Sequence, residues 1–343
     1  MTAKNRAGVP NAFFADKQWL LETPKVIRQQ AAFEAAKNFK AAMTNKRNGN
    51  IDRFTLGFKS KRTRGYVLGI EKKYLTIRGG ELTILPESIG RVRFFERPPF
   101  DGVAPADCSV MRDALGDFWL LVPVYKAVRA SPAAEATLAI DPGVRTPFSC
   151  YSPDRQQAFF EGVDMKRRVE EVQRRVATTD ARLAAATSAA ERRKLKEHRR
   201  RLFARYQRVR DDCHWKIIRR MTAEYGTVLL PHLETSRLCG GLRAKSNRQM
   251  FGISHYVFKK RLEEKCEERS VAFVDADEAY TSKTCGACGA LNQGLGSSEV
   301  FKCPACGLRC HRDLHAARNI YLRWICEHAA DRLGASPEAP LAS

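Results

Sequence analysis

Four cysteines in the C-terminal third of the chain constrain its fold more strongly than any other feature. They stand in two pairs with the spacing C-x2-C-x14-C-x2-C, at Cys285, Cys288, Cys303 and Cys306. Two residues between cysteines let both thiolates of a tight turn reach one ion, and two such turns supply the four tetrahedral ligands of zinc. A glycine follows each pair and allows the turn to continue with a positive φ. The spacing therefore predicts one structural zinc ion with no open coordination position for catalysis.

Three further residues with metal-binding side chains follow the cysteine pairs. They are Cys310, His311 and His315. Because four cysteines already complete a tetrahedral site, we expect none of the three to bind the zinc.

The charge of the chain indicates an anionic partner. Its 343 residues contain 60 Lys and Arg against 38 Asp and Glu, which gives a formal net charge of +22. Such a surplus is typical of proteins that bind nucleic acid or an acidic membrane surface. The sequence has no apolar run of about 18 residues, so we expect no membrane partner. The N-terminus also lacks the pattern of a signal peptide, which favours a reducing compartment and metal-bound rather than disulfide-bonded cysteines.

The N-terminal third predicts a helix followed by a small β-barrel. Residues 17–45 have a capping threonine, a proline in the first turn, and apolar residues that favour one face. Residues 51–126 contain six short alternating runs separated by turns. Basic residues between these runs are candidates for nucleic-acid contact: Lys59, Lys61, Arg62 and Arg64.

The middle of the chain predicts an antiparallel meander followed by a helical arm. A linker over residues 127–135 precedes three strands that end near residue 162. Residues 165–222 are rich in Ala, Arg, Lys and Glu, and we expect two antiparallel helices interrupted near Thr178 and restarted by Ser188. A cationic run in this arm predicts contact with a nucleic-acid backbone through Arg192, Arg193, Arg199, Arg200 and Arg201.

The C-terminal part alternates strands and helices around the cysteine segment. Residues 227–236 predict a buried strand, and a cationic, glycine-rich loop follows. Ser254 begins a helix whose Phe258, Leu262 and Cys266 share one apolar face. Another strand precedes the cysteines, and a last helix runs from about residue 313 to 330. We expect the tail, residues 331–343, to be disordered.

Two aspartates stand where a catalytic metal site could form. Asp141 ends an apolar strand and is followed at once by Pro142 and Gly143, so its carboxylate is expected at the edge of the sheet. Asp313 opens the last helix, where the helix dipole alone would favour an acid. Together with a third acid, the two match a nuclease site in which two Mg²⁺ ions flank the scissile phosphate.

Several phrases resemble one known family. The phrases DPGVRT, YTSKTCGACG and CPACG…HRDLHAARNI are similar to those of TnpB, the transposon-encoded RNA-guided DNA endonucleases. Two further stretches, LLETPKVIRQQAAFEAAKNF…FTLGFKSKR and LLPHLETS, resemble its eukaryotic and viral branch, Fanzor. The resemblance extends over about residues 17–325.

The resemblance implies an α/β fold with a RuvC-type, RNase H-like mixed sheet. The nuclease domain would span residues 134–330 and carry the helical insertion and a zinc ribbon at 281–311. A wedge-like β-barrel at 51–126 and a remnant of the recognition helices within 1–50 would precede it. The family also implies a guide RNA, a target DNA and two catalytic Mg²⁺ ions.

The middle acid of the catalytic set has two candidates. Aligning the family's E-D-L phrase on LLPHL puts Pro231 where the glutamate is usual. Fanzor members with this change use a glutamate just before the TSKTC phrase, which matches Glu278, and Glu234 is the competitor. The resemblance therefore implies that Asp141, Glu278 and Asp313 bind the catalytic Mg²⁺.

The sequence thus favours an RNA-guided, Mg²⁺-dependent DNA endonuclease of a mobile element. One alternative is a catalytically inactive or truncated zinc-ribbon protein that binds nucleic acid, which metal-dependent cleavage would distinguish. A second alternative is an unguided transposase, which would act without bound RNA. We expect the protein in the nucleus if its host is eukaryotic and in the cytoplasm if the host is prokaryotic.

The net charge predicts that nucleic-acid binding weakens steeply as salt rises, because each phosphate contact releases condensed counterions. Binding constants measured from low to physiological ionic strength test this. Changing the arginines within residues 192–201 to alanine should weaken binding to all sequences alike. A flat salt dependence would contradict a surface that follows the phosphate backbone.

Overall fold

The computed structural model describes residues 22–57, 65–96, 100–128, 135–231, 252–277, 280–296 and 298–332. The chain divides into two compact units, an N-terminal unit of Met1–Tyr125 and a C-terminal unit of Lys126–Ser343. Four of the predicted basic contacts, Lys59, Lys61, Arg62 and Arg64, lie outside the described residues, as do both candidates for the middle acid and most of the C-terminal tail. No helix among the described residues is long and apolar enough to cross a membrane.

The N-terminal unit combines one helix with two small antiparallel sheets. Helix α3 spans Lys25–Arg47 and packs against β1. One sheet has the order β1-β6-β7, with strands Tyr66–Ile70, Cys108–Arg112 and Phe118–Leu121. The other has the order β4-β3-β2-β5, with strands Gly90–Val92, Glu81–Ile84, Leu75–Arg78 and Gly102–Val103. Both sheets contribute to one buried core that includes Ile70 and Leu75.

Two details of this unit differ from the sequence-based expectation. The first predicted run is not a strand, since Phe54–Gly57 has no regular structure. The predicted apolar face of the helix is buried only in part, since Ile27 packs against this core but Phe33 and Phe39 are 67% and 50% exposed. Phe39 instead packs edge to face against Phe54, with ring centroids 5.9 Å apart.

The C-terminal unit is built on a five-stranded mixed sheet. Its order is β10-β9-β8-β11-β12, with strands Gln157–Glu161, Phe148–Ser152, Thr137–Pro142, Thr227–Leu229 and Ala272–Val274. The first three strands form the predicted antiparallel meander, and β11 and β12 run parallel to β8. Because side chains alternate along a strand, Leu138 and Ile140 face one side of the sheet, and Ala139 and Asp141 face the other.

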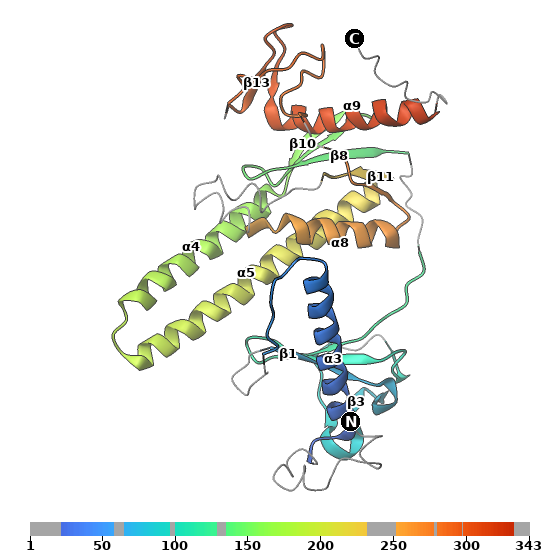
Figure 1. Ribbon diagram of the computed structural model, residues 1–343, viewed down its shortest axis with the longest axis vertical. Coiled ribbons are helices and arrows are strands. Elements are labelled where there is room, and N and C mark those ends of the chain that lie inside the picture. Colours follow the sequence, from blue (N-terminus) through green and yellow to red (C-terminus); the bar gives the residue numbers. More distant parts are fainter. Residues whose placement is uncertain are drawn as a thin grey trace. The chain divides into compact units, whose positions relative to one another are not determined.

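Two long helices form the predicted helical arm. Helix α4 spans Val163–Ala185 and α5 spans Ala189–Glu224, and the two lie side by side (Figure 1). The Ser188 hydroxyl accepts a hydrogen bond from the Glu191 backbone N–H at 3.1 Å, so the predicted restart is confirmed. The predicted break near Thr178 is wrong, and the helix continues to Ala185. The Thr178 hydroxyl donates to the Arg174 carbonyl at 3.1 Å, which satisfies this polar side chain within the helix.

Helices cover both faces of the sheet. On one face, Leu138, Ile140 and Phe148 pack with buried residues of α4, α5 and of α8, which spans His255–Glu268. The predicted apolar face of α8 is confirmed, since Phe258, Leu262 and Cys266 are almost completely buried. Helix α9, Arg312–Arg332, lies across the opposite face (Figure 1). The mixed sheet is therefore the middle layer of the unit.

Replacing Phe258 by alanine should lower the free energy of unfolding by about 3–5 kcal/mol, because the aromatic ring leaves a cavity in this core. Phe258 is fully buried and stacks on Phe148 with ring centroids 4.1 Å apart. Tyr256 is on the same helix and is 59% exposed, so Tyr256→Ala should cost less than about 1 kcal/mol. Urea denaturation of both variants measures the difference, and equal losses would contradict the described core.

Candidate functional site

The four predicted cysteines come together in one cluster. Their Sγ atoms all lie within 4.8 Å of one another. The Sγ atoms of Cys285 and Cys306 are 3.7 Å apart, and those of Cys288 and Cys303 are 3.5 Å apart. Four sulfurs at the usual Zn–S distance of about 2.3 Å from one ion lie about 3.8 Å apart in a tetrahedron. The cluster therefore fits one structural zinc.

Local backbone geometry forms the two cysteine turns. The N–H of Gly289 donates to the Cys285 carbonyl at 2.8 Å, and the N–H of Gly307 donates to the Cys303 carbonyl at 3.2 Å. Both glycines have the predicted positive φ, 76° and 73°. The backbone N–H of Cys306 points at the Cys303 sulfur at 3.4 Å and lowers the pKa of that thiol to about 6. Such a shift favours the thiolate that zinc binds.

The nearby residues Cys310, His311 and His315 are not part of the cluster. His315 has another role, because its Nε2 accepts a hydrogen bond from the Gly286 N–H at 3.1 Å. Its ring also stacks on Phe301 with centroids 4.6 Å apart. All three therefore lie outside the group of four sulfurs that could hold one metal ion in the described part of the chain.

Polar residues of α9 hold the cysteine segment in place. The Asn319 side chain donates to the carbonyls of Thr281 and Thr284, at 2.8 and 2.7 Å. Arg318 donates to the Gly286 carbonyl at 3.0 Å. The sequence reasoning missed these contacts, although polar residues at 315, 318 and 319 have the i, i+3, i+4 spacing of one helix face. The cluster is thus fixed to the helix that begins next to Asp313.

Asp141 lies at the end of β8 and is half-buried. It pairs with Ser149 in β9, and Ser149 pairs with Phe160 in β10. These three residues form one row across the sheet and face the side that α9 covers. The strand continues for one residue to Pro142, which pairs with Phe148 but has no N–H for a further ladder bond.

Asp313 lies in the first turn of α9 and is also half-buried. Its backbone N–H donates to Nδ1 of His311 at 3.3 Å. The His311 ring packs edge to face against Phe160, with ring centroids 4.8 Å apart. The start of α9 therefore contacts the same row of the sheet that contains Asp141.

Contacts farther along α9 show in which direction the helix runs over the sheet. Ile320 is buried against Ala139 and Leu229, and the Tyr321 and Tyr151 rings are 5.9 Å apart. Ala139 pairs with Tyr151, so this contact lies two residues before Asp141 along β8. The helix thus starts at the row of Asp141 and continues toward the beginning of the strand. Asp141 and Asp313 consequently lie at the same end of the same sheet face.

Strand β11 contributes no carboxylate beside Asp141. Leu229 pairs with Ala139 in parallel register. If this pairing of β11 with β8 is extended by two residues, Pro231 lies next to Asp141. The Leu230 N–H donates to the Val274 carbonyl at 3.0 Å, which extends the pairing of β11 with β12 beyond Leu229. Both candidates for the middle acid, Glu234 and Glu278, lie outside the described residues. Within the described part, the four cysteines are the only group of three or more metal-ligating side chains this close together.

Ion pairs occupy part of the cationic run on α5. Arg199 pairs with Asp180, and Arg200 and Arg201 approach Glu197 at 2.8 and 3.9 Å. Arg192 donates to the Ala186 carbonyl at 2.9 Å and so caps the end of α4. Arg193 is exposed. The helical arm therefore presents cationic side chains to solvent. Acidic residues of the same arm neutralise part of this positive charge.

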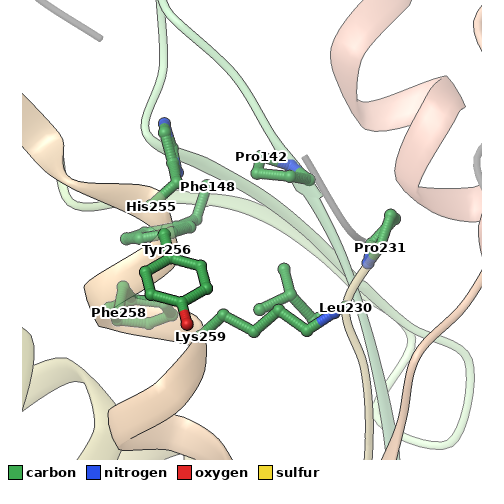
Figure 2. Close-up of a pocket in the computed structure, with 8 residues that line it drawn as sticks. All are labelled: Pro142, Phe148, Leu230, Pro231, His255, Tyr256, Phe258 and Lys259. Carbon is green, nitrogen blue, oxygen red and sulfur yellow. The ribbon is translucent and has the colours of Figure 1, made fainter. Parts of the chain in front are cut away.

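A small pocket lies next to the end of β8, on the face opposite α9. Figure 2 shows its lining, which includes Pro142, Phe148, Pro231 and His255. Its volume of about 10 Å³ has room for about one water molecule, so it is too small for a substrate.

Comparison with known proteins identifies relatives over most of the chain. The family model described as Cas12f1-like, TNB domain matches residues 255–320. A625R of Paramecium bursaria Chlorella virus 1, named as a transposase, is 46% identical over 97% of this chain and 77% of its own length. The TnpB-like protein L770 of Acanthamoeba polyphaga mimivirus is 22% identical over 86% of this chain and 56% of its own length. The predicted resemblance to TnpB is therefore confirmed at the level of the family.

Among solved structures, the Cas12f1–sgRNA–target DNA complex has a similar fold. Its TM-score is 0.51 at 15% identity, and the match covers 83% of this chain and 69% of that chain. The predicted α/β class is confirmed as a Cas12f-like fold with a mixed sheet, long helices and a four-cysteine cluster.

The cluster predicts one tightly bound zinc per chain and its loss on Cys303→Ser, because three thiolates leave the tetrahedral site incomplete. Elemental analysis of freshly purified protein measures the zinc content. Cys326→Ser is the matched control, since this cysteine is exposed and lies outside the cluster. Wild-type protein without zinc, or an equal loss in both variants, would contradict the assignment.

Proposed function

Since the chain belongs to the TnpB-like transposase family, we propose that it is an RNA-guided, Mg²⁺-dependent DNA endonuclease of a mobile element. The observation that carries the proposal is the shared position of Asp141 and Asp313 at one end of one sheet face. Carboxylates placed in this way by a strand end and a helix start can bind hard divalent cations.

We assign the C-terminal unit to the RuvC-type, RNase H-like nucleases. Three antiparallel strands followed by two strands parallel to the first support this assignment. So does the position of Asp141 on the central strand, β8, with a helix carrying Asp313 on the same face. We further place the zinc ribbon at residues 281–311, inserted before that helix, and a wedge-like domain at 51–126.

The two aspartates fit a Mg²⁺ site by their chemistry. Both supply oxygen ligands, and both are half-buried rather than enclosed, so a phosphate can approach them. Bound Mg²⁺ would supply activation of a water and stabilisation of the leaving oxygen. The role of the protein residues is to hold these carboxylates in a fixed arrangement, which β8 and α9 provide.

We propose Glu278 as the third carboxylate. Val274 and Ala276 both pack on the side of the sheet that α9 covers, against Ala139 and Leu229. The next residue, Asp277, pairs with Arg323 of α9, so the described chain stays on the α9 side up to the residue before Glu278. Glu234 comes three residues after Pro231 in the sequence and is the weaker candidate.

Guide RNA and target DNA are the partners that the charge favours. The net charge of +22 supports contact with phosphates over a large surface. In such a complex, base pairing reads the sequence and the protein holds the backbone. The structural neighbour was solved with sgRNA and target DNA, which supports the same class of partner here. We assign the arginines of the helical arm to backbone contact.

The finer family assignment is to the Fanzor branch. It is supported by the phrases LLETPKVIRQQAAFEAAKNF and LLPHLETS, and by the viral origin of A625R. A Fanzor protein acting on host DNA would be found in the nucleus of a eukaryotic host.

A nucleic-acid-binding protein without catalysis is the second candidate function. Pro231, which cannot bind a metal, stands beside Asp141 in the continued register and favours this alternative. It would bind guide and target but leave the DNA intact. An unguided transposase, in contrast, would act on DNA without bound RNA.

Asp141→Ala and Asp313→Ala should each abolish Mg²⁺-dependent cleavage, because each removes a carboxylate from the metal site. Guide RNA binding should persist, since neither change removes a cation. Cleavage is measured with one guide and one target, and RNA that co-purifies with the wild-type protein identifies the guide. Asp212→Ala is the control, because this exposed acid of α5 pairs with Lys216 at 2.8 Å and with Arg168 of α4 at 4.0 Å, and so belongs to the helical arm. Cleavage by either site variant at the wild-type rate would contradict the proposal.

Glu278→Gln should be as inactive as Asp141→Ala, because the amide keeps the size of the side chain but cannot replace its charge. Glu234→Gln should retain most activity. The two variants are compared in the same cleavage assay. An active Glu278→Gln beside an inactive Glu234→Gln would reverse the assignment, and loss in neither would exclude both as the third ligand.

A further inference from the structure

The loop that joins β8 to β9, residues 143–147, begins two residues after Asp141. Within this loop, the N–H of Gly143 donates to the Pro147 carbonyl at 3.2 Å. A Cβ on Gly143 would lie 2.8 Å from the Thr146 carbonyl oxygen, so the turn is too tight for a larger residue. Lys166 of α4 donates to the Arg145 carbonyl and holds the far side of the loop.

His255, the first residue of α8, holds the near side of the loop. Its Nε2 lies 3.2 Å from the Gly143 carbonyl oxygen. A carbonyl can only accept, so the hydrogen is on Nε2. Burial lowers the pKa of His255 to about 4, and the ring is therefore neutral with a single N–H. This single N–H donates its hydrogen bond to the Gly143 carbonyl.

Packing alone does not account for a histidine at this position. The ring is 5% exposed and packs edge to face on Phe148, with centroids 5.6 Å apart. Its neighbours in the pocket lining are mostly apolar (Figure 2). Its Nδ1 is buried and has no hydrogen-bond partner in the described part of the chain. A phenylalanine would pack equally well without burying this nitrogen, so the distinctive contribution of the histidine is the bond to Gly143.

The backbone just before His255 is anchored to α5. The Tyr206 hydroxyl donates to the Gly252 carbonyl at 2.6 Å, and His214 Nε2 lies 2.9 Å from the Ile253 carbonyl. Arg210 donates to the Ser254 hydroxyl at 3.0 Å. Three consecutive residues are thus tied to one long helix, which gives His255 a fixed position from which to hold the loop.

We propose that His255 is a positioning residue that sets the place of Asp141 through the Gly143 carbonyl. The inference rests on the proposed function of Asp141 as a Mg²⁺ ligand. The loop begins two residues after Asp141, so a bond that holds Gly143 also limits the movement of the end of β8, where Asp141 lies. Neither nitrogen of His255 contacts substrate or metal in this role.

Two variants separate the hydrogen bond from the packing. His255→Phe keeps an aromatic ring on Phe148 and removes the N–H, whereas His255→Gln restores a donor at a similar reach. His328→Phe is the control, because it makes the same chemical change at an exposed position of α9. Melting curves establish that each variant is folded.

The first measurement is amide hydrogen exchange in the loop, at residues 143–146, without guide or target. Exchange in His255→Phe should be about tenfold faster than in the wild type, since a loop that loses an anchoring bond opens more often. His255→Gln should return it close to the wild-type rate. Unchanged exchange in folded His255→Phe would overturn the proposal whether or not the protein cleaves DNA.

The second measurement is the Mg²⁺ concentration that gives half-maximal cleavage. His255→Phe should raise it about tenfold or more, because residues that orient metal ligands typically change metal affinity by 10–100-fold. His255→Gln should lie near the wild type. A normal Mg²⁺ requirement in folded His255→Phe would overturn the inference alone, whereas a wild-type protein that never cleaves would overturn the proposed function.

Discussion

Ala139, Leu229 and Ile320 are buried against one another, and this contact attaches helix α9 to the central sheet. The helix carries Asp313 in its first turn, and the sheet carries Asp141 at the end of β8. Because α9 and β8 are rigid elements, the position of one carboxylate relative to the other follows from how the helix packs. The two acids are 172 residues apart in the sequence, and these apolar contacts bring the elements that carry them together.

Residues on both sides of the sheet contact the loop that follows β8. On the α9 side, Asn319 and Arg318 fix the cysteine segment to the helix, and Glu299 of that segment pairs with Arg145 of the β8–β9 loop at 3.4 Å. On the other side, Lys166 and His255 hold the same loop. The four-cysteine segment therefore supports the candidate site indirectly, through the helix and the loop that it contacts.

Local features could be predicted from the sequence, and distant contacts could not. The cysteine turns and the Ser188 cap depend on residues within three positions of each other, so the spacing alone indicates them. The break near Thr178 was wrong because its hydroxyl bonds within the helix. The hydrogen bond between His255 and the Gly143 carbonyl joins residues 112 positions apart, and no pattern of residue types in the sequence predicts it. The residue pattern indicates a strand end at Asp141 and a helix start at Asp313, but their joint role rests on the family resemblance, since an acid at either place is common by itself.

The central claim is that Asp141 and Asp313 share a metal ion at the end of β8. The most direct test is anomalous scattering from Mn²⁺ in crystals of the protein with its guide RNA and target DNA. The account predicts an anomalous peak within about 2.5 Å of a carboxylate oxygen of both aspartates. Mn²⁺ that binds only one of them, or that binds elsewhere on the chain, would contradict the account.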